Sequence, residues 1–288
     1  MSSQSARRWK RYSGEAIAVL ALAAVTLLAC RTAGPVRAGL GVEVSQEALL
    51  SLLADRHRAV SSIKALVDVQ GARGRGSFMG ILQMRPPEDI RFQGVDSLGR
   101  TAFDFISRGE EFELYLPARR EVIKGRLDAL DREAGPAVSV PLPDLLAAVS
   151  ALVSPFVDVE EVTALERRDG AYLLNVFLAE PSTRQSTRLL RRLWFEGERL
   201  VLIREEVFGP SGASRATFTL EDFRLLDGEW RPHRLILARG AAPAADARPV
   251  PVLTVGIREL QVNPRLDPEA FTFGSIPGVA VREAGEER

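Results

Sequence analysis

The sequence contains very little cysteine and histidine, and this scarcity excludes several kinds of site. Its 288 residues include one cysteine, Cys30, and two histidines, His57 and His233. A single thiol cannot form a disulfide within the chain, and this set supplies neither the ligand spacing of a zinc site nor a Cys-His catalytic pair. No G-x-S-x-G turn is present, and the glycine-rich stretch 71–76 is predicted as a hairpin turn because no helix follows it. We therefore predict no catalytic residues, no metal site and no cofactor.

The balance of charge gives no indication of a nucleic-acid partner. The formal net charge of the chain is zero. Residues 7–11 carry four cations against the single acidic residue Glu15, so the chain that follows is slightly acidic. A basic surface for nucleic acid is therefore not expected. The adjacent glutamates at 110–111, 160–161 and 205–206 would point to opposite faces of strands, and we predict them to be solvated surface.

An apolar run near the N-terminus is too short to cross a membrane. Residues 16–29 are uncharged and end at Cys30, whereas a transmembrane helix needs about 20 apolar residues. A cationic stretch followed by a short apolar core is typical of a secretory signal peptide. The stretch Leu-Leu-Ala-Cys at 27–30 resembles the bacterial lipobox, which implies a lipoprotein signal peptide over 1–29 and lipidation of Cys30. A plain signal peptide with an incidental cysteine is the alternative.

Two segments have the spacing of helices. Residues 30–44 are rich in Gly and Ala and predict a tether, and after it Ser45 can cap a helix over residues 46–59. A second helix is predicted over 144–153, where Pro143 can start it. Its apolar positions are Leu142, Leu145, Leu146, Val149, Leu152 and Val153. Because the remaining positions are mostly alanine, this helix needs apolar cover on two faces.

From residue 64 onward the hydrophobic period changes from 3.6 to 2. The stretches KALVDVQG, EDIRFQG and EFELYLP alternate apolar and polar residues, which predicts antiparallel strands with one apolar face. The pattern resumes after residue 160, where Glu196-Gly197 and Asp227-Gly228 indicate hairpin turns. We count about ten or eleven strands, and a sheet of that size curls or closes. The fold class is therefore mainly β (α+β), with a barrel or half-barrel over residues 45–281 and a polar tail over 282–288.

Several motifs occur in an order that resembles one family. After the lipobox and the short helix come MRPPEDIRFQGVDSLGRTAFDF, then DGEWRPHRLIL, then NPRLDPEAFTFGSIPGVAV. Over residues 45–281 this order resembles the LolA/LolB-type lipoprotein carriers and their lipoprotein relatives. The resemblance implies a curled antiparallel sheet that forms an unclosed barrel of about eleven strands with covering helices. It also implies an apolar cavity that takes the acyl chains of lipoproteins.

The resemblance further implies roles for particular residues. In the family an apolar side chain on a loop between early strands helps to insert cargo; the corresponding loop here is GVDSLGR, with Leu98 at its tip. A leucine that folds back on the sheet is the alternative. The two helices are candidates for a lid, and candidate positions of the second are Leu145, Leu146, Val149, Leu152 and Val153. Candidates for the wall of the cavity are Phe92, Phe103, Phe105, Leu114 and Leu116.

These inferences together predict a membrane-anchored periplasmic lipoprotein that binds acyl chains for transfer to, or insertion in, the outer membrane. Its expected partners are lipid acyl chains or lipoprotein cargo, the membrane through N-terminal acylation, and a periplasmic carrier protein. Arg31 follows the cysteine where an inner-membrane retention signal would have aspartate, which favours the outer membrane of a Gram-negative-type cell envelope. No enzyme activity is expected.

Two other classes of function stay open on the sequence. The segment 126–160 is longer than in the simplest members of the family, and relatives of this fold also serve in envelope-stress sensing or as structural and interaction lipoproteins. Such a protein would have a barrel filled by its own side chains. A lipid or glycan hydrolase is the third possibility, and only His57 and His233 could supply its base.

Overall fold

The computed structural model describes residues 43–285, apart from 73–75, 97, 135–137, 139, 154, 156, 159–160, 180–186 and 240–250. Cys30, the predicted signal peptide and almost all of the predicted tether lie outside the described residues. Residues from Val44 onward belong to one compact unit.

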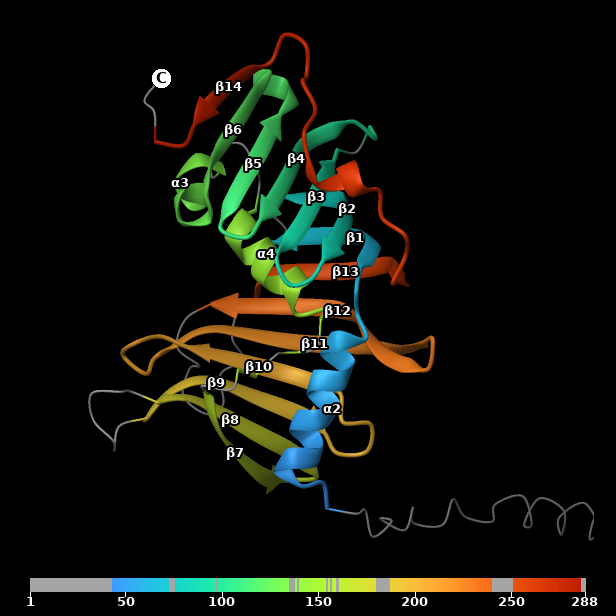
Figure 1. The fold of residues 1–288 in the computed structure, drawn as a ribbon, viewed down its shortest axis with the longest axis vertical. Coiled ribbons are helices and arrows are strands. Elements are labelled where there is room, and N and C mark those ends of the chain that lie inside the picture. Colours follow the sequence, from blue (N-terminus) through green and yellow to red (C-terminus); the bar gives the residue numbers. More distant parts are fainter. Residues whose placement is uncertain are drawn as a thin grey trace, which may run out of the picture. The chain divides into compact units, whose positions relative to one another are not determined.

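One continuous sheet of 14 strands runs through this unit, in the order β14-β6-β5-β4-β3-β2-β1-β13-β12-β11-β10-β9-β8-β7 (Figure 1). The strands are β1 (Ile63–Gly71), β2 (Ser77–Arg85), β3 (Asp89–Val95), β4 (Thr101–Arg108), β5 (Glu111–Leu116), β6 (Glu121–Arg126), β7 (Glu161–Arg168), β8 (Ala171–Ala179), β9 (Thr187–Glu196), β10 (Leu202–Phe208), β11 (Ser214–Leu226), β12 (Glu229–Arg239), β13 (Pro251–Val262) and β14 (Ala280–Glu283). The described pairings are antiparallel except that of β14 with β6.

The order of the strands explains why the sheet stays open. Strands β1 to β6 form one meander and β7 to β13 form another, and antiparallel pairing of β1 with β13 joins the two. The ends of the sheet are β14 and β7, which do not pair with each other. The predicted mainly β, unclosed sheet is therefore confirmed. The predicted number of about eleven strands is wrong, because the sheet has 14.

Strand β14 shows why the count from sequence was too low. It has only four residues, most of them exposed, and therefore lacks the alternation that marks a strand. It forms through tertiary contacts instead: it pairs in parallel with β6, and Arg282 donates hydrogen bonds to Glu121 (2.9 Å) and Glu133 (2.6 Å). It also reaches into the segment 282–288 that the sequence predicted as a polar tail.

Two of the helices lie where the sequence predicts helices. They are α2 (Gln46–Arg58) and α4 (Leu142–Ser150); α3 (Leu130–Ala134) and the short 3₁₀ helices η2 (Pro117–Arg119), η3 (Leu127–Ala129) and η4 (Pro268–Phe271) complete the described set. The hydroxyl of Ser45 accepts a hydrogen bond from the backbone N–H of Ala48 and caps α2, as predicted. Helix α4 begins two residues earlier and ends three residues earlier than the predicted 144–153.

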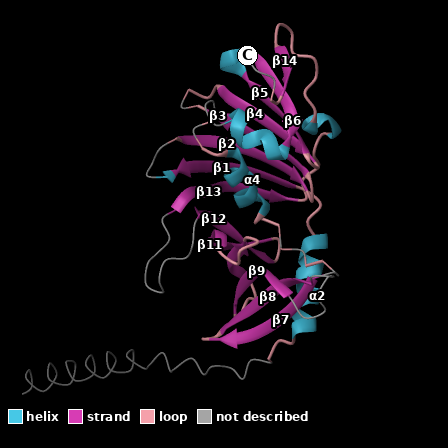
Figure 2. Cartoon of the chain, turned by 90° about the vertical axis from the view of Figure 1, so that its left-hand side faces the viewer, coloured by secondary structure: helices cyan, strands magenta, loops and turns pink. Residues whose placement is uncertain are grey.

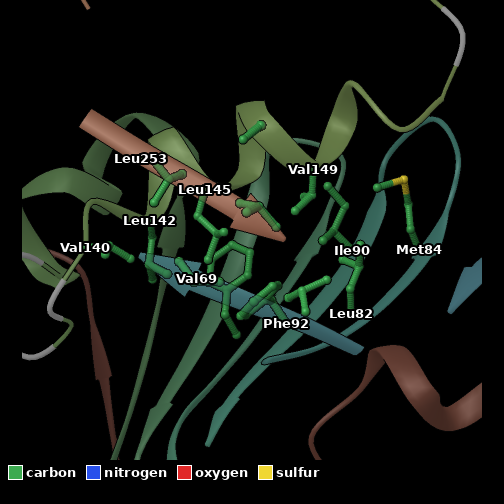
Figure 3. Close-up of a cluster of buried hydrophobic side chains, with 14 of the residues drawn as sticks. Val69, Leu82, Met84, Ile90, Phe92, Val140, Leu142, Leu145, Val149 and Leu253 are labelled. Atoms are coloured by element: carbon green, nitrogen blue, oxygen red, sulfur yellow. The ribbon is translucent and has the colours of Figure 1, made fainter. Parts of the chain in front are cut away.

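Helix α4 packs on the concave face of the sheet and fills much of it. Its residues Leu142, Leu145 and Val149 are fully buried and point toward strand residues that include Val69, Leu82 and Phe92 (Figure 3). Figure 2 shows this helix against the strands on either side of β1. At its N-terminal end the carboxylate of Asp144 pairs with Arg239 of β12 (2.6 Å). The helix is thus fixed both by apolar burial and by an ion pair.

Two glycines make room for aromatic rings under α4. A Cβ at Gly80 would lie 2.2 Å from the Phe92 ring, and one at Gly94 would lie 2.2 Å from the Phe103 ring. The two rings stack with their centroids 6.1 Å apart, and Phe78 meets both edge-on. This half of the concave face is therefore closely packed.

Other segments cover the remaining surfaces of the sheet. Helix α2 places Leu49 and Leu53 on a second apolar cluster formed by β8 and β9, with Phe195 among its members. Residues 264–285, which we call the C-terminal strap, run along β3 and β4 before they form β14 (Figure 1). Under the strap, Phe271 packs on Ile106 of β4. Strand β4 is consequently buried on both faces.

Candidate functional site: a groove beside helix α4

An open groove of about 370 Å³ lies beside α4, and we refer to it as the groove. The helix contributes small residues to it, Ala147, Ser150 and Ala151. The facing wall comes from β10 and β11, with Val207 and Phe218 among its side chains. The groove therefore has a largely apolar wall of strands on one side, in which Arg191 and Glu205 are the charged residues, and a helix face of small residues on the other.

The two faces of α4 explain why the groove exists. Large residues at Leu145 and Val149 fill the space toward β1 to β5, whereas Ala147 and Ser150 on the other face are exposed. Alanine and serine are too small to reach the wall formed by β10 and β11. The sequence predicts that this helix needs cover on two faces, and the groove is the face without full cover among the described residues.

A row of three charged side chains interrupts the apolar concave face beside the groove. The guanidinium of Arg191 on β9 donates to the carboxylate of Glu161 on β7 (3.0 Å) and lies 3.9 Å from the carboxylate of Glu205 on β10. All three side chains are largely buried. Burial raises the pKa of Glu205, and the positive charge of Arg191 opposes that rise.

The prediction that Glu205 and Glu206 are solvated surface is wrong. They do point to opposite faces of β10, but their side chains are only 14% and 8% exposed. Glu205 lines the groove, and Glu206 pairs with Arg204 and lies 3.8 Å from Arg192. The neighbouring side chains of Arg192 and Arg204 cover Glu206. Glu205 lies beside Arg191 on the face that α4 covers. A signal was present in the sequence: Arg191 and Glu205 occupy positions that the alternation of their strands assigns to the concave face.

The predicted lid residues are divided between the core and the open surfaces. Leu145 and Val149 belong to the core under α4, while Leu146 is half-buried against it. Val153, just past the end of the helix, lines the groove. Leu152 lines a smaller adjoining cavity of about 40 Å³.

The predicted wall residues lie together, but they lie under α4. Phe92, Phe103, Phe105, Leu114 and Leu116 are each at most 3% exposed and belong to one cluster with the helix. None of the five is among the residues that line the groove. Helix α4 itself therefore occupies the space that these five side chains surround.

Leu98 lies at the tip of the turn between β3 and β4 and is 74% exposed. The turn is held by Asp96, whose carboxylate accepts hydrogen bonds from the backbone N–H groups of Leu98 and Arg100 (both 2.9 Å). The leucine therefore projects into solvent and does not fold back on the sheet. Its role as an insertion residue stays a prediction.

The two histidines lie on different elements and line different surfaces. His57 on α2 lines the groove, and His233 is buried on β12, where its Nδ1 lies 3.2 Å from the backbone oxygen of Arg231. Over the described part of the chain, no three Asp, Glu, His or Cys side chains gather as metal ligands would. None of the described helices combines the length and the apolar character needed to span a bilayer.

The sequence by itself has no match among protein-family models, and no curated protein sequence matches it. Solved structures do match. A LolA superfamily protein from Nitrosomonas europaea superposes with a TM-score of 0.51 at 15% identity, over 80% of this chain and 98% of that one. A structure from Vibrio parahaemolyticus that is described as an outer membrane lipoprotein-sorting protein domain superposes with a TM-score of 0.52 at 15% identity. The match covers 77% of this chain and 94% of that one.

A third match points to the same architecture. A DUF1329 family protein from Desulfovibrio piger superposes with a TM-score of 0.50 at 14% identity, over 78% of this chain and 96% of that one. At such identities the matches establish the fold. The chain has the LolA-like fold, as the resemblance in its sequence predicts.

Proposed function

Starting from the LolA-like fold, we propose that this protein is a lipid-anchored lipoprotein of the bacterial cell envelope that binds acyl chains in the groove. Its role is to carry lipids or lipoproteins to the outer membrane, or to insert them there, and not to catalyse a reaction. The observation that carries the proposal is an open groove with a largely apolar strand wall on one side and the small-residue face of α4 on the other.

The size of the groove supports an acyl ligand. A methylene group occupies about the volume of a water molecule in the liquid, about 30 Å³. The groove of about 370 Å³ therefore holds roughly a dozen methylene groups. That is most of one fatty chain.

The energetics of transfer make catalytic residues unnecessary. Burying a chain of about fourteen carbons contributes roughly 11 kcal/mol at about 0.8 kcal/mol per methylene. The chain gives up a similar amount when it leaves its previous site, so the net transfer is close to neutral. A carrier needs only an apolar site that stays open in water when no ligand is bound.

Two residues complete the proposal. Acylation of Cys30 would hold the mature chain at the membrane, because more than one acyl chain gives stable anchoring. Leu98, exposed in the turn between β3 and β4, would contact the membrane or the cargo during insertion. A periplasmic carrier protein would deliver the cargo.

One observation favours a second candidate function. The concave face under α4 is closely packed, as expected of a structural or interaction lipoprotein whose barrel is filled by its own side chains. On that hypothesis the groove binds no acyl chain, and the exposed surfaces carry the function.

A single experiment separates the two. A form without residues 1–30 keeps the whole compact unit and can be examined by native mass spectrometry for a retained acyl ligand. Ala147→Phe, on the exposed face of α4 that lines the groove, should remove the ligand. Ala48→Phe on the exposed face of α2 is the matched control and should retain it. Absence of ligand in the parent protein, with no uptake of added fatty chains, would favour the structural candidate.

A further inference from the structure

The strand wall of the groove contains one acidic residue whose surroundings indicate what kind of head group the groove accepts. Glu205 stands on β10 directly across from Phe218 of β11, on the same face as Val207. Its side chain is only 14% exposed, and it is among the residues that line the groove. Any amphiphile whose chain lies along this wall therefore brings its polar end close to this carboxylate or passes over it.

Among the described residues, no hydrogen-bond donor reaches the Glu205 carboxylate. Its nearest cationic neighbour is Arg191, at 3.9 Å, which is too long for a hydrogen bond. The same guanidinium donates to Glu161 at 3.0 Å. Within the described ranges, no other ion pair or hydrogen bond reaches the Glu205 side chain. The Glu205 oxygens are not among the fully buried, unpartnered side-chain atoms of the described residues, and the side chain lines the open groove. Burial of the side chain raises the pKa of Glu205.

The local charge is also unfavourable for a second anion. Arg191 carries one positive charge between the carboxylates of Glu161 and Glu205. Arg191, Glu205 and His57 line the groove, whereas Glu161 is not among its lining residues. Because the Arg191 guanidinium is hydrogen-bonded to Glu161 and also lies beside Glu205, a carboxylate or phosphate brought into the groove meets a cation already shared by two carboxylates, is repelled by Glu205 and must also be desolvated.

We propose that the groove prefers neutral amphiphiles whose head group donates a hydrogen bond, through a hydroxyl or an amide N–H, over amphiphiles with an anionic head group. Glu205 is the acceptor that makes the distinction. Hydroxyls occur on acylglycerols and amide N–H groups on N-acylated amino termini, so both lipids and lipoproteins can meet this requirement. The inference rests on the proposed function, since it assumes that the groove takes acyl chains.

The test compares two ligands that share one acyl chain. The affinity of each ligand for the form without residues 1–30 is measured by displacement of a neutral fluorescent probe, N-phenylnaphthylamine. The two ligands are monomyristoylglycerol and myristate, at mildly alkaline pH and at concentrations below those at which they self-associate. Monomyristoylglycerol can donate a hydrogen bond to the charged Glu205, whereas myristate loses that bond and is repelled. This difference corresponds to a preference of about tenfold or more for monomyristoylglycerol. The wild-type ratio alone tests the preference.

Variants test the assignment to Glu205. Glu205→Gln keeps the shape, removes the charge and should bring the two affinities within about threefold of each other. Glu198→Gln, at an exposed position in the turn after β9, is the matched control and should keep the wild-type ratio. Circular dichroism and the urea midpoint verify that each variant is folded. If Glu205→Gln does not fold, Glu161→Gln replaces it, because it removes the carboxylate that competes with Glu205 for the charge of Arg191 and should also lower the ratio.

Each outcome decides a different point. Equal binding of the two ligands by the wild type, or tighter binding of myristate, overturns the inference and leaves acyl binding intact. An unchanged ratio in a folded Glu205→Gln variant overturns the role of this residue. If neither amphiphile displaces the probe, the proposed function itself fails, and the inference fails with it.

Discussion

Replacing Leu145 with alanine tests whether α4 is a packed part of the fold. The side chain projects from α4 into the main core and is fully buried there. Alanine lacks three of its carbons, which corresponds to about 2.4 kcal/mol of transfer free energy at about 0.8 kcal/mol per methylene. The cavity left behind adds to this, and buried Leu→Ala substitutions cost about 2.7–5.0 kcal/mol. We therefore expect the free energy of unfolding to fall by about 3–4 kcal/mol.

The chain supplies two matched leucine controls for this measurement. Leu146 is half-buried on the same helix, and its replacement by alanine should cost about 1 kcal/mol. Leu98 is 74% exposed, and its replacement should change stability by less than about 0.5 kcal/mol. Urea denaturation at equilibrium measures all three, with the slope of free energy against urea expected to stay unchanged. A loss below about 1 kcal/mol for Leu145→Ala would refute the close packing of α4 on the sheet.

Three further outcomes follow from the structure. Leu98→Glu should slow transfer of bound lipid to vesicles and leave lipid retention unchanged, whereas Val162→Glu, another exposed apolar site, should leave both unchanged; slower transfer in both variants would contradict a special role for the turn. Cys30→Ala should move the protein from the membrane fraction to the soluble fraction, and persistence in the membrane would contradict lipidation. The hydrogen bond from Arg282 lowers the pKa of Glu133. The stabilisation of the fold by the ionised Glu133 is therefore present above the usual pKa of 4.5 and is lost as pH falls through the lowered value. The difference in unfolding free energy between wild type and Glu133→Gln should shrink over that acidic range.

The sequence predicted those parts of the fold that local pattern determines. Helix α2 has a capping serine and a stripe of leucines. The predicted range 46–59 differs from the observed helix by one residue at the C-terminal end. The hairpin at Asp227-Gly228 forms as predicted, because both residues adopt positive φ (50° and 84°), a conformation that glycine adopts without strain. The antiparallel, one-sided character of the sheet followed from the alternation of apolar residues in strands such as β3 and β5.

Features that depend on distant parts of the chain were not predictable from local pattern. Strand β14 exists because Arg282 meets Glu121 and Glu133, more than 140 residues away in sequence, and because β6 offers a free edge. The burial of Glu205 likewise depends on its neighbours in space. Alternation placed it on the concave face, but only the fold shows that Arg191 lies beside it and is held more closely by Glu161.

The position of α4 links the closely packed half of the concave face to the open groove. Its large residues close one side and its small residues leave the other side open, so the same nine-residue helix sets the size of the site. About a dozen methylene groups fit at about 30 Å³ each. Each further methylene must either stay in water, which forgoes about 0.8 kcal/mol of burial, or displace α4 from a core that includes Leu145. Displacing α4 costs more than about 3 kcal/mol, the cost of one buried leucine, because Leu142 and Val149 would leave the core with it. The burial of about four further methylenes therefore does not offset that cost. On this reasoning, affinity should rise with chain length up to the capacity of the groove and then level off.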